Sequence, residues 1–168
     1  MKTWVKQYKS IVVIYVTIFI ATYIAFGIIF RVGVCTSGSM EPTIMTHDII
    51  IYNRLQYMFS KPARGDSISM RSGDKLYGKR IIGIAGDFIT FHDGYVYING
   101  EKLEEDYLPE DVESNCSKTF IVPENKVFVL GDNREVSSDS RFWEEPYVDV
   151  GAVKGKMLFV IPMHIFYD

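Results

Sequence analysis

The chain has 168 residues, of which 48% are hydrophobic and 23% charged, so it holds one domain, or a small domain with an appendage, and it is not disordered. The formal net charge is −3, and the acidic excess lies after the first 30 residues without a basic stripe, which argues against nucleic acid as a partner. Cys35 and Cys116 are too few for a disulfide-rich mini-protein. Neither they nor the three histidines have the spacing of a metal site, so no metal and no cofactor are expected.

An uncharged apolar stretch fills residues 10–30. As an α-helix, these 21 residues would rise about 31 Å, which matches the roughly 30 Å thickness of a bilayer's hydrocarbon core. A buried core helix seldom runs this long without a polar face. A cleavable signal sequence has a shorter apolar core followed by a small-x-small site, which the residues after Phe30 do not provide. We therefore expect an uncleaved transmembrane anchor.

The lysines before this stretch predict its orientation. Positively charged flanks stay on the cytoplasmic side of a membrane, and Lys2, Lys6 and Lys9 all precede the apolar residues. The sequence thus predicts a cytoplasmic tail at residues 1–9, then the anchor, and then an extracytoplasmic domain at residues 31–168.

Short apolar runs separated by Gly, Asn and Pro residues predict that the outer domain is mostly β, built of antiparallel and partly closed sheets. The expected strands are residues 48–52, 88–91, 95–98, 120–122, 126–130 and 156–161. The Asp93-Gly94 pair predicts a hairpin between the second and third of these strands, and Pro123–Asn125 predicts another between the fourth and fifth. Residues 101–113 hold seven acids and one base, and we expect them to form a solvated surface loop.

Polar and glycine residues interrupt the strand pattern in three segments: 36–43 (TSGSMEPT), 77–87 (YGKRIIGIAGD) and 131–141 (GDNREVSSDSR). Each alone has an ordinary interpretation as a turn, a solvated lysine or a loop held by local hydrogen bonds. Together, and in this order, they resemble the motifs of bacterial type I signal peptidases, the membrane-bound proteases that remove signal peptides from exported proteins. Residues 64–66 (RGD) are similar to a further short motif of that family. The resemblance implies an N-terminal transmembrane helix followed by an antiparallel β-sheet catalytic domain of the signal-peptidase type.

The resemblance also implies a catalytic Ser–Lys dyad. Ser39 matches the family's nucleophile and Lys79 its general base. Ser37 matches the serine whose hydroxyl forms the oxyanion hole with the backbone N–H of Ser39, and Ser137 matches the hydroxyl that orients the lysine. A serine hydroxyl is a weak nucleophile until a base removes its proton, so Lys79 must be neutral, and burial among apolar groups favours that form. No acid lies within two residues of Lys79 to oppose it.

Other residues match supporting positions of the family. Charged groups that support the site are implied at Asp139, Arg141 and Arg80, and an architectural acid at Asp132. The substrate pocket is implied at Met40, Tyr77 and Gly78. Gly78 departs from the family, which usually has an aliphatic residue there. We therefore expect this pocket to accept larger substrate side chains, unless a neighbour fills the space.

These observations predict a signal peptidase I, a serine endopeptidase that cleaves exported preproteins at the outer membrane face and has signal peptides and membrane lipid as its partners. An alternative of the same class is a specialised Ser–Lys protease for a pilin, conjugation or surface-assembly substrate. A membrane-tethered β-domain that binds exported chains without cutting them is a third possibility, and the presence of both Ser39 and Lys79 argues against it. Residues 57–59 (YMF) could form either an apolar patch at the membrane surface or part of the core.

Overall fold

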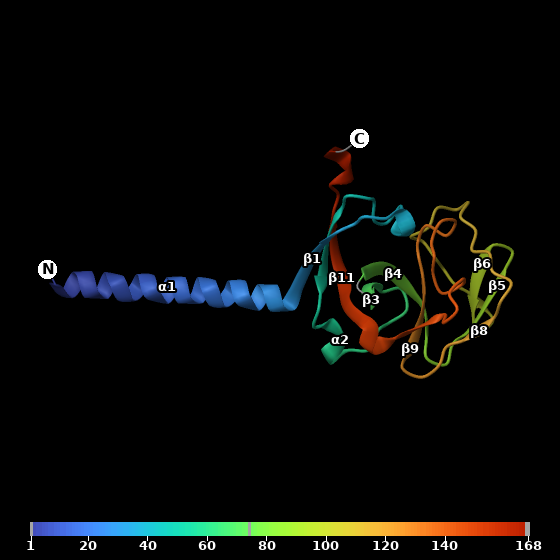
Figure 1. Ribbon diagram of the computed structural model, residues 1–168, viewed down its shortest axis with the longest axis horizontal. Helices are drawn as coiled ribbons and strands as arrows, with labels where there is room; N and C mark the ends of the chain where they lie inside the picture. Colours follow the sequence, from blue (N-terminus) through green and yellow to red (C-terminus); the bar gives the residue numbers. More distant parts are fainter. Residues whose placement is uncertain (1, 74, 167–168) are drawn as a thin grey trace.

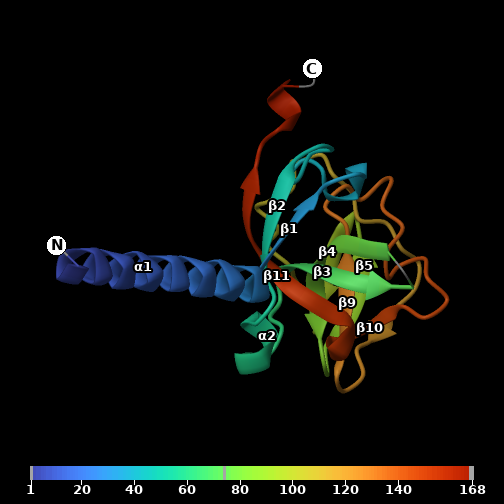
Figure 2. The ribbon, with the colours of Figure 1, turned by 60° about the vertical axis from the view of Figure 1, so that its left-hand side comes forward.

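A long helix precedes the β-domain in this computed structural model, which describes residues 2–73 and 75–166 without the side chains of residues 2–7, 72 and 164. Helix α1 (Lys2–Ile29) projects away from the sheets (Figures 1 and 2). Its segment Tyr8–Ile29 has a mean hydropathy of 2.5, and none of it is buried inside the protein. This helix is long and apolar enough to cross a bilayer, and its full exposure distinguishes it from a core helix.

The helix differs from the predicted anchor at both ends. It continues through residues 2–9 as regular helix, and it ends at Ile29, so that Phe30 opens the first strand. The side chains of Lys2 and Lys6 lie outside the described part of the structure. The strand follows the helix without a linker. The carbonyl of the last helical residue, Ile29, accepts a hydrogen bond at 2.8 Å from the backbone N–H of Arg54, which lies just after a neighbouring strand.

The larger sheet has seven antiparallel strands in the order β1-β2-β11-β3-β4-β9-β10. Their bounds are β1 (Phe30–Val34), β2 (Ile49–Asn53), β3 (Ser67–Ser72), β4 (Lys75–Ile84), β9 (Lys126–Leu130), β10 (Tyr147–Asp149) and β11 (Val153–Ile161). β1 follows α1 at one edge of this sheet, while β10 forms the opposite edge (Figure 2). Bulges interrupt the pairing of β11 with both β2 and β3, and that of β4 with β9.

The smaller sheet has four strands in the order β7-β6-β5-β8 and lies on the far side of the domain from α1 (Figure 1). Its strands are β5 (Phe88–His92), β6 (Tyr95–Ile98), β7 (Glu101–Lys102) and β8 (Phe120–Ile121). The predicted hairpin between β5 and β6 is confirmed, since His92 pairs with Tyr95 and both turn residues have positive φ, 50° at Asp93 and 81° at Gly94. The mostly β, antiparallel fold class is confirmed as well.

The second predicted hairpin is wrong. β8 pairs with β5 in the small sheet, whereas β9 pairs with β4 and β10 in the large sheet. The chain leaves the small sheet at Val122, which exchanges backbone hydrogen bonds with Gly86 and Asp87 rather than with β9. The rings of Phe120 and Phe128 then pack against each other between the two sheets in a tilted arrangement, at a centroid distance of 4.6 Å and an interplanar angle of 47°. Packing between the sheets therefore replaces the local hairpin.

Three apolar clusters hold the domain together. The first lies between the two sheets and is centred on Ile89, Val96 and Phe128. The second lies on β3, β4 and β9, and the third joins Met40 and Ile44 to β2. Four short helical turns complete the described part of the domain, η1 (Gly38–Met40), α2 (Gln56–Phe59), η2 (Val150–Ala152) and η3 (His164–Phe166).

Residues 57–59, in α2, combine the two expected roles: one side chain packs in the domain and two lie on its surface. The Tyr57 hydroxyl donates to the Asp66 carboxylate at 2.8 Å, so this side chain belongs to the fold. Met58 and Phe59 are 71% and 85% exposed and form the apolar surface that was one of the two options.

We predict that Gly83→Ala destabilises the domain. A Cβ at this position on β4 would lie 2.5 Å from Ile89 Cδ1, 3.0 Å from Val122 Cγ2 and 3.3 Å from Phe128 Cβ, so the cluster between the sheets would have to shift. Overpacking of this kind lowers the free energy of unfolding by about 1–3 kcal/mol. Thermal unfolding of the full chain in detergent measures it. Gly151→Ala is the matched control, because nothing lies within 4 Å of its Cβ, and equal melting temperatures for the two variants would contradict the prediction.

Candidate active site

The first motif forms a short turn that a buried side chain anchors to the large sheet. Ser37 is extended, with φ −145° and ψ 148°, and the single turn η1 (Gly38–Met40) follows it. Met40 is 2% exposed and packs with Ile44 against β2, which fixes the turn to the large sheet. Ser39 is half-buried just before this anchor, and Ser37 is exposed. The buried methionine therefore holds Ser39 at the surface of the sheet.

A cysteine that sequence reasoning left without a role supports the same turn. The Cys35 thiol is buried and donates to the backbone carbonyl of Ser37 at 3.2 Å. Burial raises the pKa of this thiol. Cys35 and Cys116 are both free, and Cys35 acts here as a small buried hydrogen-bond donor.

The first and third motifs meet at a glycine. The carbonyl of Ser39 accepts a hydrogen bond from the backbone N–H of Asn133 at 3.2 Å. At Gly131, a Cβ would collide with both this carbonyl oxygen and the Ser137 hydroxyl. Glycine is required there because the two segments approach too closely for any side chain. Its place at the start of the third motif was the signal for this constraint in the sequence.

The second and third motifs meet at the lysine amine. Lys79 lies on β4, is 2% exposed, and donates from Nζ to Ser137 Oγ at 2.8 Å. Its β3 register partner is Ile68, which belongs to the apolar cluster of that face. The predicted proximity of Lys79 and Ser137, residues that are far apart in the sequence, is thus present in the structure.

Burial lowers the pKa of Lys79. No acid lies near Lys79 in the sequence, but the folded third motif brings carboxylates close to the lysine, and these affect its pKa as well. The charge of Asp139 opposes the effect of burial, Arg141 adds to that effect, and Asp132 opposes it again. Burial is the largest contribution, so the neutral amine is favoured at lower pH than for an ordinary lysine.

The loop behind the lysine is built on a buried ion pair. Arg141 donates to both carboxylate oxygens of Asp139, in each case at 2.9 Å, and both residues are almost fully buried. Asp139 also accepts the backbone N–H of Gly131 at 3.1 Å, and Arg141 donates to the backbone carbonyl of Arg134 at 2.7 Å. The pair therefore ties together both ends of the loop that carries Ser137.

Arg80 points away from Lys79 and joins three segments. It donates to both oxygens of Asp132, at 2.9 and 2.6 Å, and to the carbonyl of Gly65 at 2.9 Å. The ring of Tyr107 lies against the guanidinium, 3.8 Å from its carbon to the ring centroid. Arg80 and the buried Asp132 thus fix β4 to the start of the third motif.

The acidic segment is only partly the solvated loop that was expected. Glu105 accepts from the Arg134 guanidinium, with one bond at 2.5 Å, and its side chain is only 10% exposed. Arg134 also donates to Ser114 and to the carbonyl of Gly131. The acid count could not reveal this contact, because the other acids of the segment, such as Glu104, remain exposed. Glu105 therefore clamps the segment onto the third motif.

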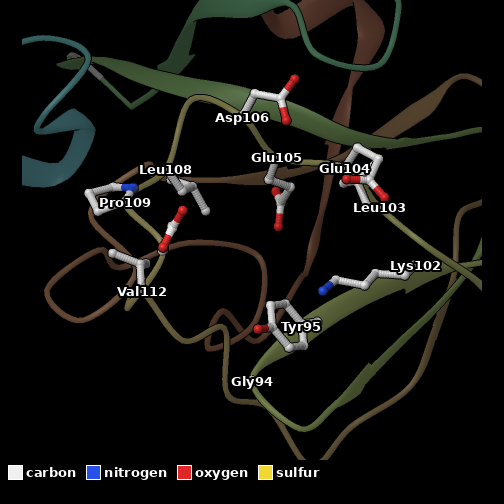
Figure 3. Close-up of a pocket in the computed structure, with 11 residues that line it drawn as sticks. Gly94, Tyr95, Lys102, Leu103, Glu104, Glu105, Asp106, Leu108, Pro109 and Val112 are labelled. Atoms are coloured by element: carbon white, nitrogen blue, oxygen red, sulfur yellow. The ribbon is translucent and has the colours of Figure 1, made fainter.

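Two cavities of similar size have different linings. One, of about 580 Å³, is enclosed by the acidic segment and β6, and in it the Lys102 amine lies over the ring of Tyr95 at 3.2 Å (Figure 3). None of the predicted site residues lines it. Within residues 2–73 and 75–166, no group of three or more His, Cys, Asp or Glu side chains is placed to hold a metal ion.

The other cavity, of about 600 Å³, borders the predicted nucleophile. It brings together five of the predicted residues, Ser37, Ser39, Met40, Tyr77 and Gly78. The whole of residues 31–35 also lines it, so the groove runs along β1. A Cβ at Gly78 would lie 3.6 Å from Met40 Cγ, an ordinary contact, so the missing side chain leaves usable space. Lys79 is not part of this lining.

The chain is similar over nearly its full length to a known protein family. The family model "Signal peptidase, peptidase S26" matches residues 4–162. Signal peptidase I S of Bacillus subtilis is 35% identical over 150 residues, which cover 82% of each chain. Probable signal peptidase I-2 of Synechocystis is 34% identical over 84% of this chain and 66% of its own length, and signal peptidase I of Leptolyngbya laminosa is 38% identical over 64% and 57%.

The fold has a solved counterpart as well. The crystal structure of a signal peptidase I from Enterococcus faecalis matches with a TM-score of 0.51 and 32% sequence identity. The match covers 59% of this chain and 98% of that one. The chain thus spans somewhat less than two thirds of the two cyanobacterial relatives, and most of the Bacillus and Enterococcus proteins.

We predict that Glu105→Gln destabilises the protein strongly. The substitution leaves Arg134 buried without its opposite charge, a change that lowers the free energy of unfolding by about 3–5 kcal/mol. Glu104→Gln is the control, because the neighbouring side chain is exposed and a surface substitution costs about 0.5 kcal/mol or less. Thermal unfolding of both variants measures the difference. A melting temperature of Glu105→Gln equal to that of the control would show that the ion pair contributes nothing.

Proposed function

Because this chain belongs to the S26 family of signal peptidases, we propose that it is a serine endopeptidase that removes signal peptides from exported preproteins with a Ser39–Lys79 dyad. One observation carries the proposal. The Lys79 amine is buried, its pKa is lowered by that burial, and it is bonded to Ser137. A buried lysine without a carboxylate in direct contact is costly for stability alone, so a role as a base accounts for it.

In the proposed mechanism, neutral Lys79 takes the proton of the Ser39 hydroxyl as Ser39 Oγ attacks the carbonyl carbon before the cleaved bond. The negative charge of the tetrahedral intermediate falls on the substrate oxygen, where the Ser39 N–H and the Ser37 hydroxyl donate to it. One such donor is worth about 3–4 kcal/mol. Protonated Lys79 then gives its proton to the leaving amine, and the mature protein departs with a new N-terminus.

The second half returns the enzyme to its starting state. Water attacks the acyl group on Ser39 while Lys79 again accepts a proton, and the return of that proton to Ser39 Oγ releases the signal peptide. Ser137 holds the amine in place throughout, because its hydroxyl can accept from the protonated form and donate to the neutral one. Asp139, Arg141 and Arg80 act behind these groups by fixing the loop and the strand that carry them.

The position of the groove fits a substrate cut beside a membrane. We propose that residues 10–30 cross the bilayer, with residues 1–9 in the cytoplasm and residues 31–168 outside. The groove begins at Arg31, one residue after the strand follows the helix, and Ser39 lies nine residue steps from Phe30, at most about 30 Å. Signal peptides place their apolar core in the bilayer and their cleavage site just outside it. Met58 and Phe59 would add a lipid contact.

A specialised protease for one pilin, conjugation or surface-assembly substrate is the second candidate. The space beside Gly78 favours it, because a pocket that lacks the usual aliphatic wall fits an unusual cleavage site. Cleavage of a general secretory preprotein, with the cut located by N-terminal sequencing of the product, distinguishes the two. A protease that is specific for one specialised substrate would leave that general preprotein intact.

We predict that Ser39→Ala and Lys79→Ala each abolish cleavage of a secretory preprotein by the full chain in detergent. The first lacks the nucleophile and the second leaves its hydroxyl protonated. Because the two groups act as a unit, the double variant should be no slower than either single one. Ser138→Ala is the control for loss of a serine near the site, since that side chain is exposed. Substantial activity in Lys79→Ala would rule out this lysine as the base.

We predict that kcat/KM rises with pH. The pKa of Lys79 is lowered by burial, so the amine is protonated and inactive below that pKa, and the neutral fraction grows as the pH climbs through it. The rise in kcat/KM should therefore begin below the usual lysine pKa of about 10.4. A kcat/KM profile measured from pH 6 to 10 on one peptide tests this. Activity that falls steadily over that range would point to a different base.

A further inference from the structure

Ser69 on β3 carries a buried hydroxyl without a partner. The residue is 3% exposed, and among residues 2–73 and 75–166 its Oγ is the one buried side-chain oxygen or nitrogen with no hydrogen bond. A buried hydroxyl is nearly always bonded, because loss of water without compensation is unfavourable. Such an orphan in a folded protein calls for an explanation, and a ligand absent from the free protein is one.

Two glycines leave space on both sides of this hydroxyl. Ser69 pairs with Gly78 on β4 and with Gly155 on β11, and paired residues of antiparallel strands share one face of the sheet. At Gly155 a Cβ would lie 2.8 Å from the carbonyl oxygen of Asn53, so packing excludes a side chain there. At Gly78 a side chain would fit, and none is present. No cross-strand side chain therefore covers Ser69 from either neighbour.

The same face forms part of the groove beside the nucleophile. Ser69 and Gly78 line it together with Ser39 and with the apolar residues Ile44 and Ile50. Met40 packs beside Gly78 and lines the groove with it. An extended peptide in this groove would thus bring a side chain to Ser69.

We propose that Ser69 is a specificity-determining residue that selects substrates with a serine or threonine side chain close to the cleaved bond. This inference rests on the proposed function. A substrate hydroxyl can accept from Ser69 Oγ or donate to it, so the bond satisfies both groups when the groove closes over them. A substrate alanine or valine at that position would shield the Ser69 hydroxyl from water without forming a hydrogen bond to it. This weakens binding of the substrate in the transition state as well as in the ground state.

The experiment uses matched preproteins that differ at one residue. Threonine and valine have the same shape, and the pair is placed in turn at each of the first three positions before the cut, with serine and alanine as a second pair. For wild-type protein we expect kcat/KM to favour threonine over valine by about 3- to 10-fold at one of these positions. In Ser69→Ala the ratio should fall to about 1. Ser67→Ala, a buried serine two residues away that does not line the groove, should keep the wild-type ratio.

Two further results separate this inference from a structural role and from the proposed function. Ser69→Ala should melt at the wild-type temperature or above it, because the removed hydroxyl has no partner to lose. A clear fall in melting temperature would mean that Ser69 serves the fold. Equal cleavage of threonine and valine substrates by wild type at all three positions would overturn the inference alone, whereas no cleavage of any preprotein would overturn the proposed function and the inference with it.

Discussion

The burial of one amine governs the arrangement of the site. Lys79 sits on a central strand with a hydroxyl from another motif as its polar partner, and an amine in such surroundings favours its neutral form. The loop at residues 131–141 supplies that hydroxyl through Ser137. Gly131 lets this loop approach the carbonyl of Ser39 closely, and the Asp139–Arg141 pair holds the loop in shape. The ion pairs near the lysine thus stabilise the scaffold, while burial still lowers the pKa of the Lys79 amine.

The charged residues behind the site stabilise the segments that carry it. Arg80, Arg134 and Arg141 each pair with a carboxylate and also donate to a backbone carbonyl, that of Gly65 in a separate segment for Arg80 and those of Gly131 and Arg134 within the same loop for the other two. Each guanidinium therefore fixes both a charge and a chain position, which a lysine with its single ammonium could not do equally well. Glu105 extends this scaffold to a segment whose composition resembles a simple surface loop. The groove and its supports consequently form one rigid unit around the turn that carries Ser39.

The sequence predicted those features that depend on local pattern or on a whole motif. The apolar stretch, the β6 and β9 strands and the Asp93-Gly94 hairpin follow from periodicity and turn chemistry, and the motif order predicts Ser39, Lys79 and Ser137 as site residues. The failures are long-range. The turn at Pro123–Asn125 is real, but its flanking strands join different sheets because aromatic packing between sheets outweighs local pairing. Glu105 and Ser69 stood out in no sequence pattern. Glu105 is distinguished only by its ion pair with Arg134, and Ser69 only by a buried hydroxyl that has no hydrogen-bond partner.

The junction of α1 and β1 has a mechanical consequence. No linker separates the helix from the strand, and the backbone bond from Arg54 to Ile29 ties the junction to β2. With α1 as the proposed anchor, any tilt or vertical shift of the helix moves the groove with it. The apolar span of 22 residues is about 33 Å long, so a thinner bilayer would be met by tilting. Membrane thickness would then set the height at which the nucleophile meets an emerging chain, and lipid composition would become a determinant of which bond is cut.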